Sequence, residues 1–318
     1  MSDVFTITAA DGAPIAVYRW LPAAGTPRAM IQIAHGASEH AGRYTRLAEV
    51  LTAAGYGVYA NDHRGHGRTA GALERFGVAG PDGWNRLVDD ARQLTEHIAR
   101  AHPGCAIVLL GHSMGSLVAQ YYLQRDPRAL HGVVLSGTLS ALPPGSEDLD
   151  ARIDAAIRQQ GRDVPSEDFA MLFVGFNDRF ADSGPPAGAT GFEWLSRDHA
   201  EVKKYVDDPW CGLPLSNGFV ADSLRQQSDI WGPGAEERIP RHLPVLFVAG
   251  DQDPVGEYGE GVRRLADRYR RAGIPVTEHI YAGARHEVFN EINRDDVHRD
   301  LLTWLEQIMA EEKGPRIR

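Results

Sequence analysis

Short apolar runs alternate with segments of helical periodicity along most of the chain. Six segments have the length of strands, and most of them have the continuous apolar character of strands that are buried on both faces of a sheet. They cover residues 29–34, 57–60, 106–110, 131–135, 243–249 and 276–281. Helical periodicity is clearest in residues 84–98, where apolar side chains recur every three or four positions. This alternation predicts a parallel sheet that is covered by helices.

The pattern changes at two places. Near the N-terminus, residues 4–8 and 15–21 have strand character and are joined across Asp11-Gly12, a dipeptide typical of hairpin turns. Between residues 138 and 239 we find polar helical segments and clustered aromatic residues but no buried-strand run. We therefore predict a doubly wound α/β core formed by residues 1–137 and 240–318, with a helical cap inserted at residues 138–239.

Composition narrows the classes of function. The 318-residue chain is 43% hydrophobic and carries a formal net charge of −10, which argues against a nucleic-acid partner. No apolar stretch reaches the ~18 residues that a membrane-spanning helix needs, and no secretory signal is recognised. We expect a cytoplasmic protein with reduced thiols at Cys105 and Cys211. The histidines and cysteines lack zinc-site spacing, so we expect no metal and no cofactor.

The motif GHSMG at residues 111–115 lies between a buried-strand run and a helical segment that ends near Arg125. A serine hydroxyl becomes a nucleophile only when a base removes its proton and the backbone holds it exposed. A sharp strand-to-helix turn holds it, and this turn leaves room only for small residues two positions to either side of the serine. Such a string also occurs by chance as a glycine-rich turn, but its position favours Ser113 as a nucleophile.

Two backbone N–H groups are candidates for an oxyanion hole. Met114 opens the helix that follows the nucleophile, so its N–H can stabilise a developing negative charge. The second donor is expected in the loop after the first buried strand, which here reads HGASEH at residues 35–40. Ala37 is the natural candidate in that loop.

A carboxylate that orients a catalytic base is expected at the end of a later strand. The run at residues 243–249 leads into GDQDP at residues 250–254, where Asp251 and Asp253 compete for this role. We favour Asp253, which lies three residues past the glycine and is stiffened by the proline. Asp251 is expected to cap the loop or the next helix.

The base itself is predicted after the last strand. The motif GARHE at residues 283–287 places His286 just beyond the strand end, whereas His279 lies inside the strand. Ser113, Asp253 and His286 therefore form the predicted triad, in the chain order typical of α/β-hydrolases.

Two further groups of polar residues are open to more than one interpretation. Residues 61–68 contain two histidines and an aspartate, but no further metal ligand at suitable spacing. We interpret this segment as a hydrogen-bonded turn that supports the nucleophile loop. Glu39 and His40 could contact the substrate or could brace the oxyanion loop.

With these motifs in hand, the chain resembles the monoacylglycerol lipase and lysophospholipase branch of the α/β-hydrolase superfamily, of the bacterial type. Six segments carry the resemblance, in order along the chain. They are HGASEHAGRY (35–44), NDHRGHGRT (61–69), LLGHSMGS (109–116), WLSRDHAEVKKYVDDPWCG (194–212), LFVAGDQDPVG (246–256) and YAGARHEVFNE (281–291).

The resemblance implies site residues as well as an α/β-hydrolase fold. It implies the triad Ser113–Asp253–His286 and an oxyanion hole of Ala37 and Met114. It also implies that Glu39 and Arg43 lie near the polar head group of the substrate.

From these inferences we predict a serine hydrolase that cleaves monoacylglycerols or similar single-chain lipid esters, with a small-molecule ester as its partner and a cap that makes transient contact with lipid surfaces. General carboxylesterase or lysophospholipase activity, aminopeptidase activity on short peptides, and a non-catalytic ligand-binding role are the alternatives. An aminopeptidase needs acidic groups in the cap, where the sequence offers Glu167, Asp168 and Asp178.

The aromatic residues of the cap are interpreted either as the wall of an acyl pocket or as the cap's own core. They are Phe169, Phe173, Phe176, Phe180, Phe192 and Trp194.

Overall fold

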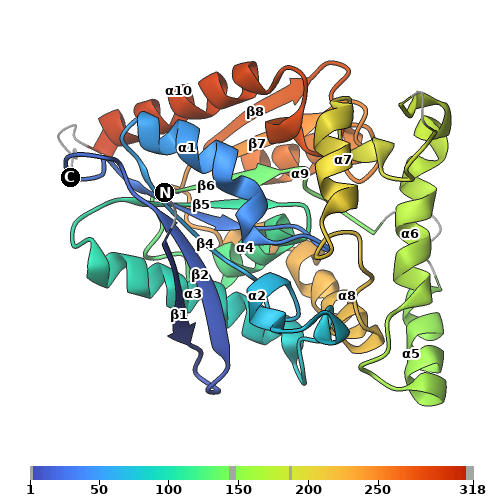
Figure 1. The fold of residues 1–318 in the computed structure, drawn as a ribbon. Helices are drawn as coiled ribbons and strands as arrows, with labels where there is room; N and C mark the ends of the chain where they lie inside the picture. The colour runs from blue at the N-terminus through green and yellow to red at the C-terminus, as the bar shows by residue number, and fades with distance from the viewer. Residues whose placement is uncertain (1–2, 143–147, 186–187, 313–318) are drawn as a thin grey trace.

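The computed structural model describes residues 3–142, 148–185 and 188–312. Eight strands form one sheet in the order β1-β2-β4-β3-β5-β6-β7-β8 (Figure 1). The strands are β1 (Asp3–Thr8), β2 (Pro14–Trp20), β3 (Met30–Ala34), β4 (Gly57–Asn61), β5 (Ile107–His112), β6 (Gly132–Ser136), β7 (Val245–Gly250) and β8 (Val276–Tyr281). The hairpin β1–β2 and the pair β2–β4 are antiparallel, whereas the pairs from β4 through β8 are parallel. The predicted mostly parallel sheet with an antiparallel start is confirmed.

Helices cover both faces of this sheet. The helices are α1 (Thr45–Ala53), α2 (Gly67–Ala70), α3 (Gly83–Ala101), α4 (Met114–Arg125), α5 (Leu149–Gln160), α6 (Glu167–Asn177), α7 (His199–Asp207), α8 (Asn217–Trp231), α9 (Glu260–Arg271) and α10 (Arg294–Glu312). Side chains of α1 and α10 form one apolar core with the sheet, and side chains of α3, α4 and α9 form another on the opposite face. This is the predicted doubly wound arrangement.

Short 3₁₀ helices occupy several of the connections. They are η1 (Ala41–Tyr44), η2 (Leu73–Arg75), η3 (Asp178–Ser183), η4 (Glu193–Leu195), η5 (Ala235–Arg238) and η6 (Val288–Asn290). Within the described residues, no helix is both long and apolar enough to cross a membrane.

The segment between β6 and β7 contains α5, α6, α7 and α8, and α5 and α6 stand at the outer edge of the molecule (Figure 1). Three of these helices begin at a residue whose side chain accepts a backbone N–H of the first turn, which satisfies a donor that the helix itself leaves free. These residues are Ser166, Asp198 and Ser216. The division into a core and a cap at residues 138–239 remains a prediction, and residues 143–147 and 186–187 of that range lie outside the described residues.

One strand is longer than its apolar run suggests. The run 106–110 predicted an end at Leu110, but β5 continues through His112 because Gly111 pairs with Ala34 of β3 and His112 pairs with Ser136 of β6. The sheet therefore extends directly to Ser113, and α4 begins at the next residue. This arrangement places Ser113 at the carboxyl edge of the parallel strands.

Candidate active site

The backbone of Ser113 makes a sharp turn between β5 and α4. Its φ of 51° and ψ of −119° are rarely adopted by residues other than glycine. The chain is crowded on both sides of this turn. A Cβ atom on Gly111 would lie 2.3 Å from the carbonyl oxygen of Gly115, and one on Gly115 would lie 2.0 Å from the carbonyl oxygen of Ala34. The two glycines are therefore required because of close backbone contacts.

The loop after β3 lies against this serine. A Cβ atom on Gly36 would be 3.2 Å from the Cβ of Ser113, and Ser38 has a positive φ of 59°. Ala37, Ser113 and Met114 line the same pocket. Among the described residues, no protein acceptor is found for the Ala37 N–H, and Met114 is the first residue of α4, whose first N–H groups have no acceptor within the helix. Both predicted oxyanion donors therefore lie at the pocket.

The imidazole of His286 contacts the Asp253 carboxylate. Nδ1 of His286 is 2.9 Å from Oδ2 and 3.0 Å from Oδ1 of Asp253, and both side chains are buried. Asp251 instead accepts the Gly283 N–H at 2.7 Å, as expected for a residue that stabilises the loop. Because Nδ1–H donates to the carboxylate, Nε2 is the ring nitrogen that is left to accept a proton.

The surroundings of His286 stabilise its protonated form more than water does. Burial by itself lowers the pKa of His286, but the negative charge of Asp253 and its hydrogen bond outweigh burial and raise the pKa above 6.5. His112 lies nearby, with 4.7 Å between the two ring centroids. Burial, together with the charge of His286, lowers the pKa of His112 to about 4. His112 is therefore neutral at neutral pH.

Ser113 and His286 line one pocket, but no hydrogen bond joins the Ser113 hydroxyl to the imidazole in the described part of the chain. A serine hydroxyl reaches different partners by rotation about its Cα–Cβ bond, and catalytic hydrogen bonds are often long before substrate binds. The structure thus brings Asp253 to His286 directly, and Ser113 to the same cavity.

A buried ionic cluster lies behind the oxyanion loop. Glu39 accepts hydrogen bonds from the Gly36 N–H (2.5 Å), the Tyr44 hydroxyl (2.8 Å) and the Arg43 guanidinium (2.6 Å). Arg43 also makes two hydrogen bonds to Glu287, at 2.6 and 2.8 Å. Burial raises the pKa of Glu287, but the Arg43 charge outweighs burial and lowers it to about 2.

This cluster is compatible with both interpretations of Glu39 and changes the expectation for Arg43. Glu39 braces the oxyanion loop through Gly36 and also lines the pocket. Arg43 lies behind Glu39 and is not among the described residues that line the pocket. The sequence analysis assigned no role to Glu287, although its position directly after the predicted base could have indicated a role in the site.

The pocket above Ser113 is largely apolar and encloses about 120 Å³. Aliphatic and aromatic side chains from α3, α4, α6, α8 and the segments between them line it. They include Trp84, Leu117, Leu139, Leu149, Phe169, Leu172, Phe173, Phe176, Trp194, Leu215, Phe219, Val220 and Leu224. Such a lining matches the hydrocarbon part of a ligand better than a peptide or a sugar.

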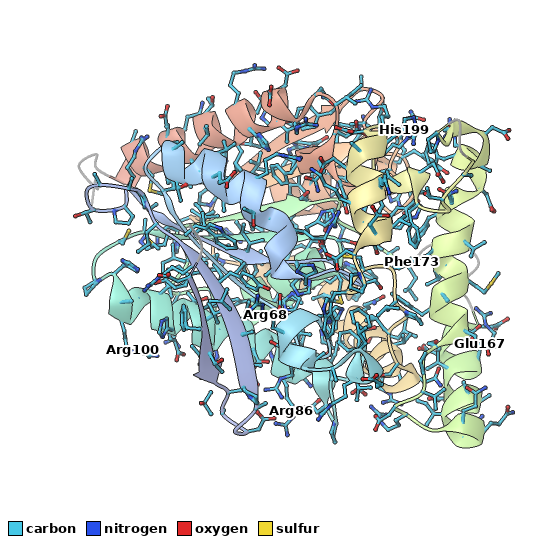
Figure 2. The ribbon with its side chains drawn as sticks, in the orientation of Figure 1. Arg68, Arg86, Arg100, Glu167, Phe173 and His199 are labelled. Atoms are coloured by element: carbon cyan, nitrogen blue, oxygen red, sulfur yellow. The ribbon has the colours of Figure 1, made fainter. Side chains whose placement is uncertain are left out.

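Four of the six aromatic residues line the pocket, and five of the six belong to or pack against one apolar cluster. Phe169, Phe173, Phe176 and Trp194 line the pocket, and Phe173 extends from α6 toward the body of the protein (Figure 2). Phe180 and Phe192 do not line the pocket and belong to an apolar cluster with Tyr205 and Trp194, against which Phe173 and Phe176 also pack. Trp194 also packs against His286, with ring centroids 5.0 Å apart. Sequence periodicity carried no signal for this contact between distant segments.

The polar loop at residues 61–68 behaves as a hydrogen-bonded turn. Asp62 accepts the backbone N–H groups of Ala41 and Arg68, at 2.8 and 2.7 Å. His63 donates its N–H to the His35 ring at 2.9 Å. These bonds hold the oxyanion loop and the loop after β4 together.

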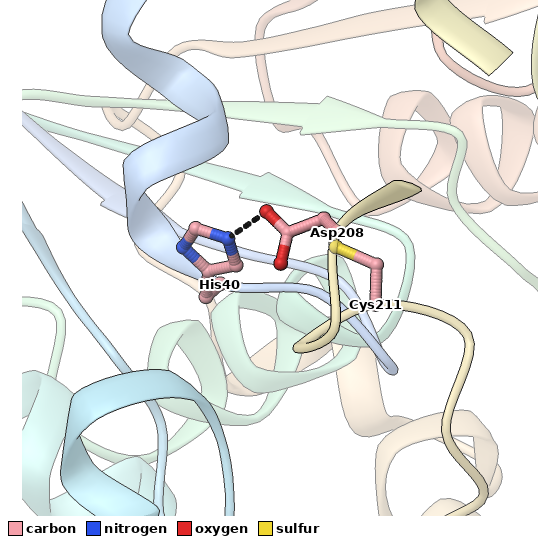
Figure 3. A group of neighbouring side chains, drawn as sticks. All are labelled: His40, Asp208 and Cys211. Carbon is pink, nitrogen blue, oxygen red and sulfur yellow. Dashed lines mark hydrogen bonds and ion pairs between the residues drawn. The ribbon is translucent and has the colours of Figure 1, made fainter. Parts of the chain in front are cut away.

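One cluster outside this loop has the composition of a metal site. Potential ligand atoms of His40, Asp208 and Cys211 lie within 4.8 Å of one another (Figure 3). However, Nδ1 of His40 accepts the Gly42 N–H at 3.2 Å, so Nε2 carries the proton and donates to Asp208 at 2.9 Å. Burial also raises the pKa of the Cys211 thiol. Before a metal could bind, the thiol would have to lose its proton and His40 its hydrogen bonds to Gly42 and Asp208, and we assign no metal to this cluster.

Known proteins resemble this chain over most of its length. The profile of the family described as Serine aminopeptidase, S33 matches residues 25–293. The chain is 30% identical over 283 residues to the monoacylglycerol lipase of Mycolicibacterium smegmatis, and this match covers 88% of each protein. It is 37% identical over 312 residues to the monoglyceride lipase of Homo sapiens, and this match covers 97% of the chain and 92% of that lipase. Its fold is similar to that of a thermostable carboxyl esterase from Bacillus coagulans in complex with glycerol, with a TM-score of 0.87, 27% identity, and coverage of 97% of this chain and 99% of the esterase.

Proposed function

The chain belongs to the Serine aminopeptidase, S33 family of α/β-hydrolases, in its monoacylglycerol lipase branch, and on this basis we propose that Ser113, His286 and Asp253 hydrolyse monoacylglycerols or similar single-chain esters. The protein is a carboxylic ester hydrolase. The observation that carries the proposed substrate and residues is the apolar pocket, which contains a serine on a strained turn and a histidine paired with a buried aspartate.

In the proposed first half-reaction, the Ser113 oxygen attacks the ester carbonyl carbon while Nε2 of His286 takes the hydroxyl proton. Asp253 holds the imidazole and stabilises its positive charge. The N–H groups of Ala37 and Met114 stabilise the negative charge on the former carbonyl oxygen. When the bond from carbon to the alcohol oxygen breaks, His286 gives its proton to the departing alcohol, and an acyl-enzyme remains.

In the proposed second half-reaction, a water molecule replaces the alcohol. His286 takes a proton from the water as the water oxygen attacks the acyl carbon. The bond to the Ser113 oxygen then breaks, and His286 returns the proton to that oxygen. The products are a fatty acid and the free enzyme.

We assign the polar end of the substrate to Glu39. Its carboxylate lines the pocket and already accepts three hydrogen bonds, and a carboxylate has about four acceptor positions, so one remains for a glycerol hydroxyl. Arg43 acts through Glu39 in this proposal, because Arg43 lies behind it.

We also propose a cytoplasmic location with transient contact between the cap and lipid surfaces. Support for lipid contact comes from α6, where the side chains of Met171 and Val174 are 63% and 55% exposed. The sequence has two cysteines, too few for the disulfide framework common in secreted proteins.

The rival aminopeptidase function has less support. It would need a carboxylate in the pocket that is free to bind an ammonium group. Glu167, Asp168 and Asp178 are not among the described residues that line the pocket, and Asp168 pairs with Arg152 at 2.7 Å. Of the carboxylates that do line it, Glu39 and Glu287 are already bound to Arg43.

The nucleophile assignment is tested by Ser113→Ala. This variant should lose hydrolysis of glycerol monooleate and labelling by a fluorophosphonate probe, because both require the serine oxygen. Ser140→Ala is the matched control, since Ser140 is a buried serine that does not line the pocket. Hydrolysis that persists in Ser113→Ala would contradict the assignment, and faster cleavage of an aminoacyl-naphthylamide than of the glyceride would favour the aminopeptidase.

A further inference from the structure

The imidazole of His286 is confined on several sides. Its Nδ1 lies 2.9 Å from the Asp253 carboxylate. A Cβ atom on Gly137 would lie 2.9 Å from Cε1 and 3.0 Å from Nδ1 of the ring, so the Gly137 backbone closes that edge. The rings of His112 and Trp194 pack against the imidazole, with ring centroids 4.7 and 5.0 Å from its own. The other ring nitrogen, Nε2, has no hydrogen-bond partner within the described residues, and the ring lines the apolar pocket.

Trp194 differs in origin from the other three contacts. Asp253 and Gly137 follow the ends of β7 and β6, and His112 is the last residue of β5, so all three are held by the sheet. Trp194 belongs to η4, in the segment between β6 and β7 that also contains α5 to α8. That segment therefore supplies one of the four contacts around the imidazole.

The backbone of Trp194 is bound on both sides. Its carbonyl accepts the His286 N–H at 3.3 Å, and its N–H donates to Oδ1 of Asn177, the last residue of α6, at 3.1 Å. Asn177 in turn donates to Glu193 at 2.9 Å. Because Trp194 is also only 3% exposed, its ring has little freedom to move away from the imidazole.

Helix α6 packs on the same tryptophan. The ring centroids of Phe173 and Phe176 lie 5.6 and 5.1 Å from that of Trp194. Within α6, all of which the structure describes, Asn177 is the only buried residue. The end of α6 is thus attached to the residue that contacts the imidazole, while the rest of the helix is more loosely held.

A hydrogen bond to Asp253 fixes one end of the imidazole but allows the ring to pivot about that bond. In the proposed reaction Nε2 must meet the Ser113 oxygen, the departing alcohol and the water in turn, and a misplacement of about 1 Å can lower a rate about 100-fold. Rings packed against the imidazole prevent this pivoting. We propose that Trp194 is a positioning residue for His286, a role that rests on the ester hydrolysis proposed above.

Trp194→Leu tests this role with two esters, p-nitrophenyl acetate and p-nitrophenyl decanoate. An acetyl group makes little use of the apolar wall, so a residue that only lined the acyl pocket would mainly change KM for the decanoate. A positioning residue should instead lower kcat for the acetate, by roughly 10- to 100-fold, with little change in KM. Trp194→Phe keeps an aromatic ring at this place and should recover most of the loss.

Phe169→Leu is the matched control for the kinetics. Phe169 lines the same pocket, and among the described residues its ring contact is with Phe173 at 5.0 Å and not with His286. Its loss of activity should be larger for the decanoate than for the acetate, whereas Trp194→Leu should affect both esters.

Tryptophan fluorescence gives a readout that needs no turnover. A protonated imidazole in contact with an indole quenches its emission, so the difference in emission between wild type and Trp194→Phe should titrate with the pH midpoint of kcat/KM. The charged groups that act on the base are Asp253, Glu287 and Glu39, and His112 is the titratable ring beside it. The pKa of Glu287 is about 2 and that of His112 about 4, so neither changes its charge between pH 5 and 8.

Trp84→Phe is the control for the fluorescence, because Trp84 lines the pocket and its ring contact among the described residues is with Phe219. The emission that it removes should stay constant over this pH range. A wild-type kcat for the acetate in Trp194→Leu, or a Trp194 emission that does not titrate, would overturn the inference.

Ser113→Ala separates this outcome from a failure of the proposed function. If Ser113→Ala abolishes hydrolysis while Trp194→Leu keeps it, only the inference fails. Hydrolysis that survives Ser113→Ala would overturn the proposed function, and the inference with it. If circular dichroism shows that Trp194→Leu does not fold, the emission titration decides alone, since it needs only wild type and Trp194→Phe.

Discussion

At the scale of single residues, the proposed chemistry depends on two unusual environments. Ser113 adopts a strained backbone conformation, which costs about 1–3 kcal/mol and is maintained by the surrounding fold. His286 is buried, yet its pKa is raised because Asp253 outweighs the effect of burial. The strain keeps the hydroxyl at the pocket, and the raised pKa makes the imidazole a better base.

The raised pKa of His286 predicts the pH dependence of hydrolysis. The imidazole must be neutral to accept the serine proton, so activity falls as the pH drops through its pKa. Because Asp253 raises that pKa, the midpoint of kcat/KM should lie above 6.5. A pH profile measured with a water-soluble p-nitrophenyl ester checks this, and a rate that stays flat from pH 5 to 8 would contradict the assignment of the base.

Asp253→Asn separates the role of the carboxylate from that of the histidine. Without the negative charge, burial dominates and lowers the pKa of His286, so the midpoint of the remaining activity should move to lower pH. The turnover number should fall by about 10⁴, as when an orienting aspartate is lost from other triads.

Asp251→Asn is the control for this prediction, because Asp251 stands at the same strand end but binds the Gly283 N–H instead. It should keep the wild-type midpoint. If the two variants behaved in the opposite way, Asp251 would be the triad acid.

At the scale of elements, Arg43 joins two loops that carry different parts of the site. It binds Glu39, which holds the loop after β3 through Gly36, and Glu287, which follows His286 in the loop after β8. The exposed fraction of the Arg43 side chain is 11%, so water screens these pairs little. The proposed oxyanion donors and the proposed base therefore share one support.

Arg43→Met should destabilise the protein by about 3–5 kcal/mol, because Glu39 and Glu287 would remain buried without a counter-charge. The kcat of the folded variant should also fall, since Glu39 would no longer be held to brace the oxyanion loop. Urea denaturation and steady-state kinetics measure the two effects.

Arg92→Met is the control, since Arg92 forms an exposed pair with Glu96 one helical turn away. Its cost should stay below about 0.5 kcal/mol. An Arg43→Met variant as stable and active as this control would show that the cluster supports neither loop.

At the scale of the whole molecule, the segment before α7 is joined to the loop that contains His286. The backbone N–H groups of His286 and Glu287 donate to the carbonyls of Trp194 and Leu195, at 3.3 and 2.8 Å. Glu291, which is fully buried, joins the same two segments. Its carboxylate accepts the N–H groups of Arg197 (3.1 Å), Arg285 (2.9 Å) and Ile292 (2.9 Å) and the Arg197 guanidinium (2.9 Å).

Glu291→Gln tests this junction. Either oxygen that becomes an NH₂ group would face two N–H donors and accept neither, so the variant should lose roughly 2–5 kcal/mol of unfolding free energy. Glu306→Gln is the control, because Glu306 is 60% exposed and makes only a 3.3 Å pair with Arg28. Equal midpoints of urea unfolding for the two variants would contradict a structural role for Glu291.

Several features were readable from the sequence because they depend on residues close together in the chain. Apolar runs predicted the buried parallel strands, whereas the side chains of β8 are only half-buried. All six apolar positions from Trp84 to Ile98 are buried in α3. The two glycines around Ser113 identified the turn, although only Gly111 is crowded by neighbouring residues of the chain, whereas Gly115 is crowded by Ala34 of β3. Ser113, Asp253 and His286 were predicted because each follows the end of a strand, and parallel strands bring their carboxyl ends to one edge of the sheet.

Only the tertiary structure decided which of these groups touch. Asp251 and Asp253 both follow the end of β7 within three residues, and the path of the loop brings Asp253 rather than Asp251 to the imidazole. The position of Arg43 behind Glu39 depends on Glu287, 244 residues further along the chain. Local patterns record which face of a strand or helix is buried, whereas contacts between distant segments depend on how those elements pack, and no local periodicity encodes that packing.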